Sequence, residues 1–535
     1  MWREQLATLS REYANLNLPR QEATDGPLVL HWALIGGAIG LLNREILLGV
    51  ALRQLGARPR IILCDAVCSG CQIRTFSPED SIQDWKRICG NCMTVGKQMV
   101  EAAGLESIGL SELVSEEDRR AAREMANSAD FDKLKVLERD GYKLGLYAMS
   151  AAVRYFRAMP HVVSSEQFEP VFREYMYTAL ISMRASQVAA EHIRPDIYLT
   201  THNIYSEWGP AYKTFTSNGT PVYWHIASIL QGHVMIRRCD GEYTSHPYYC
   251  DAERWSELSA IPLTRAQEVD LDRFMDIMCE GKNSLMEYFG EAPQTPEVLR
   301  RRFDIPEGGK VWGIFSPLPW DAHLSADPLL FDDVDEWLVR CIECAAEVRD
   351  VTWVVKMHPT ESLRDSRMSM EKVLREAFPV LPDNVRLITG KDRINTFGLI
   401  DLLDGGITTR GTTGMELVLR GKQAMASGSS HYGFKGFSLD SRNVEEFFVH
   451  MRSAPGLGPL APEKRELARR YAYDFFIRRN LPFDLYDQRS MAVNGEVLKG
   501  LNCGEPSMLR TMCEAMLGQS SGSVERPAGV EFLAD

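Results

Sequence analysis

Five cysteines lie close together near the start of the sequence, and the spacing of four of them is typical of a metal site. Two C-x2-C pairs are separated by seventeen residues, and a glycine inside each pair permits a tight turn. The pattern predicts one structural zinc ion bound by Cys68, Cys71, Cys89 and Cys92. An iron–sulfur cluster, uncoordinated thiols or a disulfide are the alternatives, and Cys64 is a spare fifth thiol.

A second candidate site lies in the loop that contains Lys356 and His358. A buried strand is predicted just before this loop, and Pro359 biases His358 toward extended backbone geometry. The imidazole is therefore expected at the carboxyl end of a strand, where it can exchange a proton or a hydrogen bond with a ligand. A single histidine also commonly has only a structural role, so its neighbours must decide between the two readings.

The loop that begins near Thr408 carries residues suited to binding an anion. Gly411 lets the backbone approach a ligand, and Thr412 or Thr413 can cap the next helix and leave its first N–H groups aimed at a phosphate. Thr413 and Glu416 also have the spacing of a capping box, which would make this a purely structural helix start. Both interpretations stay open on the sequence alone.

The elements that must position these residues form two α/β series. In the first, apolar runs at 28–35 and 61–63 flank a helical pattern at 41–55, and a further strand is predicted at 195–199. The second series alternates strictly, which predicts a parallel sheet covered by helices on both faces. Its predicted strands are 310–316, 352–357, 385–389, 405–408 and 423–426, and its helices are 334–348, 363–378, 394–403 and 413–420.

This pattern predicts an α/β protein of two Rossmann-like, doubly wound lobes that face a cleft. We expect an N-terminal lobe over 1–305, with a Cys-rich insertion at 64–96 and a helical insertion at 106–190. The second lobe is expected over 306–460. A C-terminal helix over 461–500 and a partly disordered tail over 501–535 complete the prediction.

Charge and hydropathy exclude several classes of protein. The 535 residues carry a net charge of −13, so the chain as a whole does not attract nucleic acid. The longest apolar run, 28–42, is shorter than the roughly 20 residues that a bilayer-spanning helix needs. The mixed-charge N-terminus is unlike a secretory signal. A cytoplasmic protein with at most peripheral membrane association is expected.

The two loops of the second lobe together resemble a known family. Lys-x-His-Pro at 356–359, Gly-Thr-Thr-Gly-x-Glu at 411–416 and Ser-Gly-x-x-x-Tyr at 427–432 are similar to the donor lobe of GT-B bacterial surface-polysaccharide transferases. Capsule polysaccharide biosynthesis proteins of the β-Kdo transferase type are the nearest likeness. Bacterial sialyltransferases, polysialyltransferases and teichoic-acid glycerophosphotransferases are more distant. The resemblance is specific over about 350–440 and only architectural elsewhere.

The resemblance implies a metal-independent glycosyltransferase that binds a nucleotide sugar on its C-terminal lobe. His358 would contact or protonate the leaving phosphate, Thr412 and Thr413 would hydrogen-bond it, and Glu416 would hold nucleotide hydroxyls. Lys356, Lys422 and Tyr432 are further candidates for contacts with the nucleotide sugar. Two threonines stand where family members often have two serines, and the hydroxyls are preserved.

The same resemblance implies an acceptor and a general base on the N-terminal lobe. The acceptor would be a glycan or glycolipid, and Asp65, His202 or Glu207 would deprotonate its hydroxyl. The donor is expected to be CMP- or UDP-linked, with Kdo or a related acidic sugar as the first candidate. Glycerophosphotransfer, sugar-nucleotide epimerisation and a non-catalytic capsule assembly or export role are the alternatives, because a fold alone does not fix function.

Overall fold

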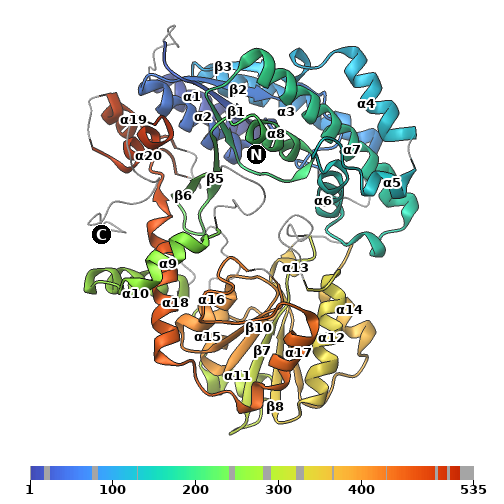
Figure 1. The fold of residues 1–535 in the computed structure, drawn as a ribbon, viewed down its shortest axis with the longest axis vertical. Helices are drawn as coiled ribbons and strands as arrows, with labels where there is room; N and C mark the ends of the chain where they lie inside the picture. Colours follow the sequence, from blue (N-terminus) through green and yellow to red (C-terminus); the bar gives the residue numbers. More distant parts are fainter. Residues whose placement is uncertain are drawn as a thin grey trace. The chain divides into compact units, whose positions relative to one another are not determined.

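We analysed a computed structural model of the chain. It describes residues 2–16, 25–74, 82–128, 130–239, 248–280, 291–320, 330–363, 367–428, 430–487, 492–502 and 506–518. These residues form two compact units. Unit 1 comprises the described residues within 1–156, 163–247 and 479–527, and unit 2 comprises those within 157–162 and 248–478 (Figure 1).

Unit 1 contains a seven-stranded sheet in the order β13-β6-β5-β4-β1-β2-β3. Its strands are β1 (Leu28–Trp32), β2 (Arg58–Leu63), β3 (Glu106–Gly109), β4 (Ile197–Thr200), β5 (Val222–Ala227), β6 (His233–Arg238) and β13 (Leu481–Pro482). The strands from β5 to β3 are parallel, whereas β6 runs antiparallel to both of its neighbours. The chain leaves β1 toward β2 and β3 and then returns to β4 on the other side, so the strand order reverses between β1 and β4.

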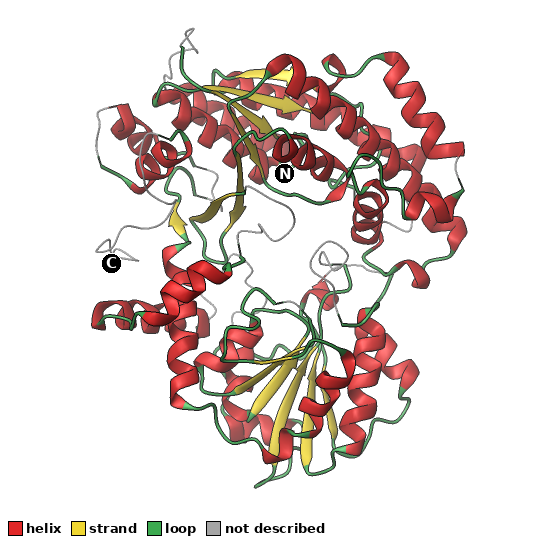
Figure 2. Cartoon of the chain, in the orientation of Figure 1, coloured by secondary structure: helices red, strands yellow, loops and turns green. Residues whose placement is uncertain are grey.

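The helices of unit 1 pack around this sheet and on one another (Figure 2). They are α1 (Trp2–Asn15), α2 (Ile39–Gln54), α3 (Lys86–Ala102), α4 (Glu116–Ser128), α5 (Phe131–Lys135), α6 (Leu144–Phe156), α7 (Ser165–Val188), α8 (Tyr205–Ser217), α19 (Gly495–Asn502) and α20 (Met508–Met516). Helix α2 is apolar on nearly all sides, and its residues from Leu42 to Leu52 are buried. A helix of this kind must be enclosed by other elements.

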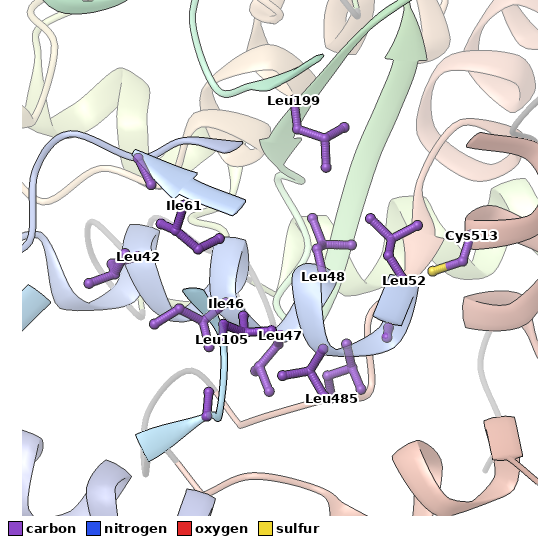
Figure 3. Close-up of a cluster of buried hydrophobic side chains, with 14 of the residues drawn as sticks. Leu42, Ile46, Leu47, Leu48, Leu52, Ile61, Leu105, Leu199, Leu485 and Cys513 are labelled. Carbon is purple, nitrogen blue, oxygen red and sulfur yellow. The ribbon is translucent and has the colours of Figure 1, made fainter. Parts of the chain in front are cut away.

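The C-terminal segment supplies part of that enclosure. Leu485 and Cys513 are fully buried and belong to the same hydrophobic cluster as Leu47, Leu48 and others on α2 (Figure 3). A fully buried leucine contributes roughly 1.5–3 kcal/mol relative to an exposed one. Apolar burial therefore ties the described residues after 479 to unit 1.

Unit 2 contains a six-stranded sheet in the order β12-β11-β10-β7-β8-β9, in which all paired strands are parallel. The strands are β7 (Lys310–Phe315), β8 (Val351–Lys356), β9 (Val385–Ile388), β10 (Gly405–Thr408), β11 (Gln423–Ala426) and β12 (Leu439–Asp440). The helices are α9 (Ala252–Ala260), α10 (Arg265–Cys279), α11 (Pro296–Arg302), α12 (Val334–Glu347), α13 (Thr360–Leu363), α14 (Met370–Ala377), α15 (Thr396–Leu402), α16 (Thr413–Leu419), α17 (Val444–Arg452) and α18 (Pro462–Tyr473).

The predicted fold class is confirmed: two Rossmann-like α/β units each surround a largely parallel sheet. The predicted second series matches the observed strands to within about one residue, and only the helix at 363–378 is divided, into α13 and α14. The boundaries of the units differ from those expected. Residues 248–280 and 291–305 belong to unit 2, and α18 is followed by a return to unit 1 at 479. The region expected as a tail contains α20, and its residues 503–505 and 519–535 lie outside the described residues.

The described helices include no candidate membrane span. None of them combines the length and the apolar character that crossing a bilayer requires.

Candidate functional site

The carboxyl edge of the unit 2 sheet brings the two predicted loops together. Strand β7 pairs with β8 on one side and with β10 on the other, so the loops that follow all three strands leave the same edge. Lys356 is the last residue of β8 and is 7% exposed, and its carbonyl accepts a hydrogen bond from the backbone N–H of Ser316 at 3.0 Å. Ligands of open α/β sheets bind at this edge.

One nitrogen of the His358 imidazole accepts a hydrogen bond from the backbone, and this determines which nitrogen carries the proton. The backbone N–H of Thr360 donates to His358 Nδ1 at 3.2 Å, so in the neutral ring Nδ1 is the acceptor and Nε2 carries the proton. A histidine in this tautomer can donate a hydrogen bond from Nε2 to an anion. His358 is half-buried at the start of the loop.

Two hydrogen bonds hold Gly411 in place in the second loop. The backbone N–H of Gly411 donates to Thr408 Oγ1 at 3.1 Å, and the Tyr432 hydroxyl donates to the Gly411 carbonyl at 3.0 Å. Tyr432 is fully buried, and a Cβ atom at Gly414 would overlap its hydroxyl oxygen. Tyr432 therefore positions the Gly411 loop and does not present its hydroxyl to a ligand, which corrects its predicted role as a contact.

Thr412 and Thr413 leave their hydroxyls available. Thr412 occupies the N-cap position of α16, yet its side chain makes no capping hydrogen bond, and Thr413 is already inside the helix. The capping-box alternative for Thr413 and Glu416 is therefore wrong. Within the described chain, neither hydroxyl has a hydrogen-bond partner, and the backbone N–H groups of both residues are also without one. This arrangement can accept an anion that the protein itself does not supply.

Lys356 and Glu416 are two titratable groups at this edge whose charges influence each other. Burial lowers the pKa of Lys356 to about 8, and the Glu416 charge opposes that shift. Burial likewise raises the pKa of Glu416 to about 7, against the effect of Lys356. Both groups therefore change charge near neutral pH, which is typical of functional sites.

Lys422 does not join this group. It precedes β11 and therefore lies at the amino edge of the parallel sheet, where its Nζ donates to the Asp401 carbonyl at 3.2 Å. The prediction that Lys422 contacts the same nucleotide as Lys356 is corrected. Residues 419–422 lead from the end of α16 to the start of β11, which places Lys422 one helix length away from the loop.

In unit 1, the five clustered cysteines line one partly open cavity. The cavity lies at the carboxyl edge of the sheet, where the strand order reverses, because its walls follow β1, β2 and β4. Its other lining residues are Leu34, Ile35, Ala66, Ile73, Arg74, Ile88 and Glu207. Such a reversal is a general ligand position in open α/β sheets. The C-x2-C spacing identified four of these thiols, whereas only the fold shows that Cys64 also lines the cavity.

The candidate general bases have different surroundings. Asp65 accepts hydrogen bonds from the backbone N–H of Ser111, at 3.0 Å, and from its hydroxyl, so it orders the segment after β3. Glu207 is completely buried and lines the cysteine cavity, where burial raises its pKa to about 8. His202 is half-buried, with Nδ1 2.9 Å from Thr201 Oγ1. A role for any of these three residues as a general base stays a prediction.

Comparisons with known proteins give only remote likenesses. No protein-family model matches the chain. No curated protein matches it either. Among solved structures, the β-Kdo 2,4 transferase KpsC of Thermosulfurimonas dismutans is 14% identical, with 58% of this chain and 87% of that chain covered and a TM-score of 0.35. A glycosyltransferase of Rickettsia africae is 11% identical, with 89% and 99% covered and a TM-score of 0.28.

A UDP-GlcNAc 2-epimerase of Neisseria meningitidis is 9% identical, with 89% and 99% covered and a TM-score of 0.25. At these identities and TM-scores the likenesses carry no argument about the reaction or the substrate. The function must be argued from this chain's own residues.

Proposed function

We propose that this protein is a glycosyltransferase that binds a nucleotide-sugar donor at the carboxyl edge of the unit 2 sheet. The observation that carries the proposal is the set of unpartnered donors in the Gly411 loop beside Lys356 and His358. The hydroxyls and backbone N–H groups of Thr412 and Thr413 make no hydrogen bond within the described chain. A phosphate group is the ligand chemistry that satisfies several such donors together with a cation.

In the proposed reaction, an acceptor hydroxyl attacks the anomeric carbon of the sugar and gives its proton to a general base. The bond between that carbon and the phosphate oxygen breaks, and the phosphate leaves with the electron pair. Lys356 offsets the charge of that phosphate, and His358 donates from Nε2 to one of its oxygens. Thr412 and Thr413 donate to the others. Donors that are already fixed before the reaction stabilise the developing charge without a cost of reorganisation. Glu416 accepts hydrogen bonds from donor hydroxyls.

The finer assignment rests on the motif resemblance. We propose Kdo or another acidic sugar as the transferred group and a growing bacterial capsule or surface polysaccharide as the acceptor, with the reaction on the cytoplasmic side. CMP-Kdo and UDP-linked sugars can be compared as donors by chromatography of the released nucleotide. Release of nucleotide from a UDP sugar alone would contradict the Kdo assignment and leave the glycosyltransferase proposal intact.

A screen of nucleotides by thermal shift tests the donor site. We expect CMP, CDP, UMP or UDP to stabilise the protein, by about 2.7 kcal/mol at a hundredfold excess over the dissociation constant. Lys356→Met should abolish the shift, because it removes the cation beside the phosphate. Lys422→Met should keep it, because Lys422 lies at the opposite edge of the sheet. Flat melting curves with all four nucleotides would favour the non-catalytic assembly role.

Nucleotide affinity should depend on pH with a maximum between about 7 and 8. Phosphate binds protonated Lys356, so affinity falls as the pH rises through about 8. Glu416 accepts hydrogen bonds only as a carboxylate, so affinity also falls as the pH drops through about 7. Isothermal titration calorimetry across this range measures both limbs.

The Glu416→Gln variant separates the acid side of this affinity–pH profile from its alkaline side. The variant should lose the acid limb, because its side chain does not titrate. Its alkaline limb should move to lower pH, because the Glu416 charge no longer raises the pKa of Lys356. An unchanged profile in this variant would show that Glu416 does not act at the nucleotide site.

A further inference from the structure

The cysteine cavity of unit 1 has more thiols than one zinc ion can use. Cys64, Cys68 and Cys71 come from the segment after β2, and Cys89 and Cys92 come from one face of α3. The fold therefore brings two separate stretches of chain, with five sulfur atoms between them, to the walls of one cavity. Thiolate sulfur is the ligand type that selects zinc and iron–sulfur clusters.

The distances between the sulfur atoms distinguish a zinc site from an iron–sulfur cluster. A zinc ion with four thiolates at about 2.3 Å requires neighbouring sulfurs about 3.8 Å apart. Among the residues that the structure describes, no three of these sulfurs lie within 4.8 Å of one another. In a four-iron cluster each thiolate binds a different iron, so the four sulfurs stand farther apart than around a single ion.

Close packing fixes the positions of the two stretches. A Cβ atom at Gly70 would lie 2.8 Å from Tyr175 Cδ1 and 2.9 Å from its backbone nitrogen, so the loop after β2 rests directly on α7. A Cβ atom at Gly36 would lie 2.8 Å from the Cα of Gly96, so α3 rests on the loop after β1. Packing therefore fixes the backbone positions of the two stretches that carry the cysteines.

Hydrogen-bond donors around the cavity suit an anionic thiolate cluster. The backbone N–H of Gly37 donates to Cys92 Sγ at 3.0 Å, and Arg74 Nη2 donates to Cys89 Sγ at 3.2 Å. Arg74 is 4% exposed and is held by the Ser69 carbonyl at 2.7 Å. Hydrogen bonds to the sulfurs and a compensating charge are the means by which proteins stabilise iron–sulfur clusters and set their potentials.

Glu207 is a buried carboxyl group that lines the same cavity. Its side chain is completely buried and lines the cavity, and Oε1 accepts a hydrogen bond from the backbone N–H of Gln72 at 2.5 Å. Its other oxygen, Oε2, is buried and has no hydrogen-bond partner within the described chain. The sulfide and thiolate sulfurs of a cluster have no hydrogen to donate to this oxygen, so the proposal does not rest on Glu207.

We propose that this cavity binds a [4Fe–4S] cluster through Cys68, Cys71, Cys89 and Cys92, with Cys64 as a fifth thiol that is not a ligand. The proposal is independent of the nucleotide site, because every residue that carries it belongs to unit 1. It replaces the single zinc ion that the C-x2-C spacing predicts on the same four cysteines.

The test is purification of the full chain without oxygen, from cells supplied with iron, followed by metal and sulfide analysis. We expect about four iron and four acid-labile sulfide per chain, with a brown chromophore that bleaches on reduction with dithionite. About one zinc per chain without iron would overturn the proposal in favour of the zinc site. Iron without sulfide, or no metal at all, would also overturn it.

A matched pair of double variants distinguishes ligands from other thiols. Cys89→Ala/Cys92→Ala should lose the iron, the sulfide and the chromophore. Cys341→Ala/Cys344→Ala has the same spacing on helix α12 of unit 2 and should retain all three. Cys64→Ser should also retain the cluster, and its loss there would overturn the ligand assignment. If the Cys89/Cys92 variant does not fold, reconstitution of the metal-stripped parent with ferrous iron and sulfide, compared with zinc alone, decides between the metals.

Discussion

Gly414→Ala should disable the Gly411 loop and lower the stability of the protein. A Cβ atom at this position would overlap the Tyr432 hydroxyl and lie 2.5 Å from its Cζ. Tyr432 is fully buried, so it cannot swing aside without leaving a cavity. Overpacking of this kind costs about 1–3 kcal/mol, and a unit of this size loses roughly 2–4 °C in Tm per kcal/mol. Nucleotide binding should be lost with it, because Tyr432 holds the Gly411 carbonyl.

The matched control is Gly40→Ala. Both glycines are the second residue of a helix, but a Cβ atom at Gly40 would have no neighbour within 4 Å. Alanine is the better helix former by about 1 kcal/mol, so this variant should keep or slightly raise the Tm. Differential scanning calorimetry and nucleotide titration of both variants measure the contrast. Equal Tm values and equal affinities would show that the Tyr432 contact does not hold the loop.

His358→Ala should lower turnover of the nucleotide sugar by about a hundredfold or more, while the Tm changes little. The expected loss is that of one fixed hydrogen-bond donor to a developing negative charge. The hydrogen bond from the Thr360 N–H to Nδ1 orients the ring. Because the ring is only half-buried, its removal leaves no large cavity in the core. Steady-state kinetics with the donor identified in the nucleotide screen gives kcat and KM separately, and the effect should fall mainly on kcat.

His450→Ala is the control for loss of an imidazole in the same unit. His450 is also half-buried, but it lies on α17, where Nδ1 is 3.1 Å from Ser441 Oγ. This variant should keep full turnover. If His358→Ala turns over at the parent rate, or if it unfolds, His358 is a structural histidine and the assignment of the donor site fails.

The sequence by itself determined the alternating series from β7 to β11 in unit 2 and two of its loops. Each strand from β7 to β11 is a short apolar run, and helical patterns separate these strands, so local periodicity was sufficient to predict five of the six strands of the parallel sheet. Strand ends then identified Lys356, His358 and the Gly411 loop as neighbours. This worked because parallel strands bring their carboxyl ends to one edge whatever their order.

Tertiary structure decided which side chains remain available for chemistry. Capping-box spacing at Thr413 and Glu416 satisfied the local rule, yet the helix begins one residue earlier than that rule needs, and both threonine hydroxyls stay unpartnered. Tyr432 reads as a polar loop residue, but packing against Gly414 buries it. Hydrogen bonds and burial of this kind join residues far apart in the chain, and no local pattern encodes them.

Local sequence patterns were also insufficient to predict the site in unit 1. C-x2-C spacing identified four thiols, but spacing within a chain does not state how far apart two stretches place their sulfur atoms. That distance is set by how α3 packs on the loop after β1 and by how the loop after β2 packs on α7. The membership of residues 479–487 in unit 1 was also decided by burial, because an apolar helix such as α2 is covered by whichever segment can reach it.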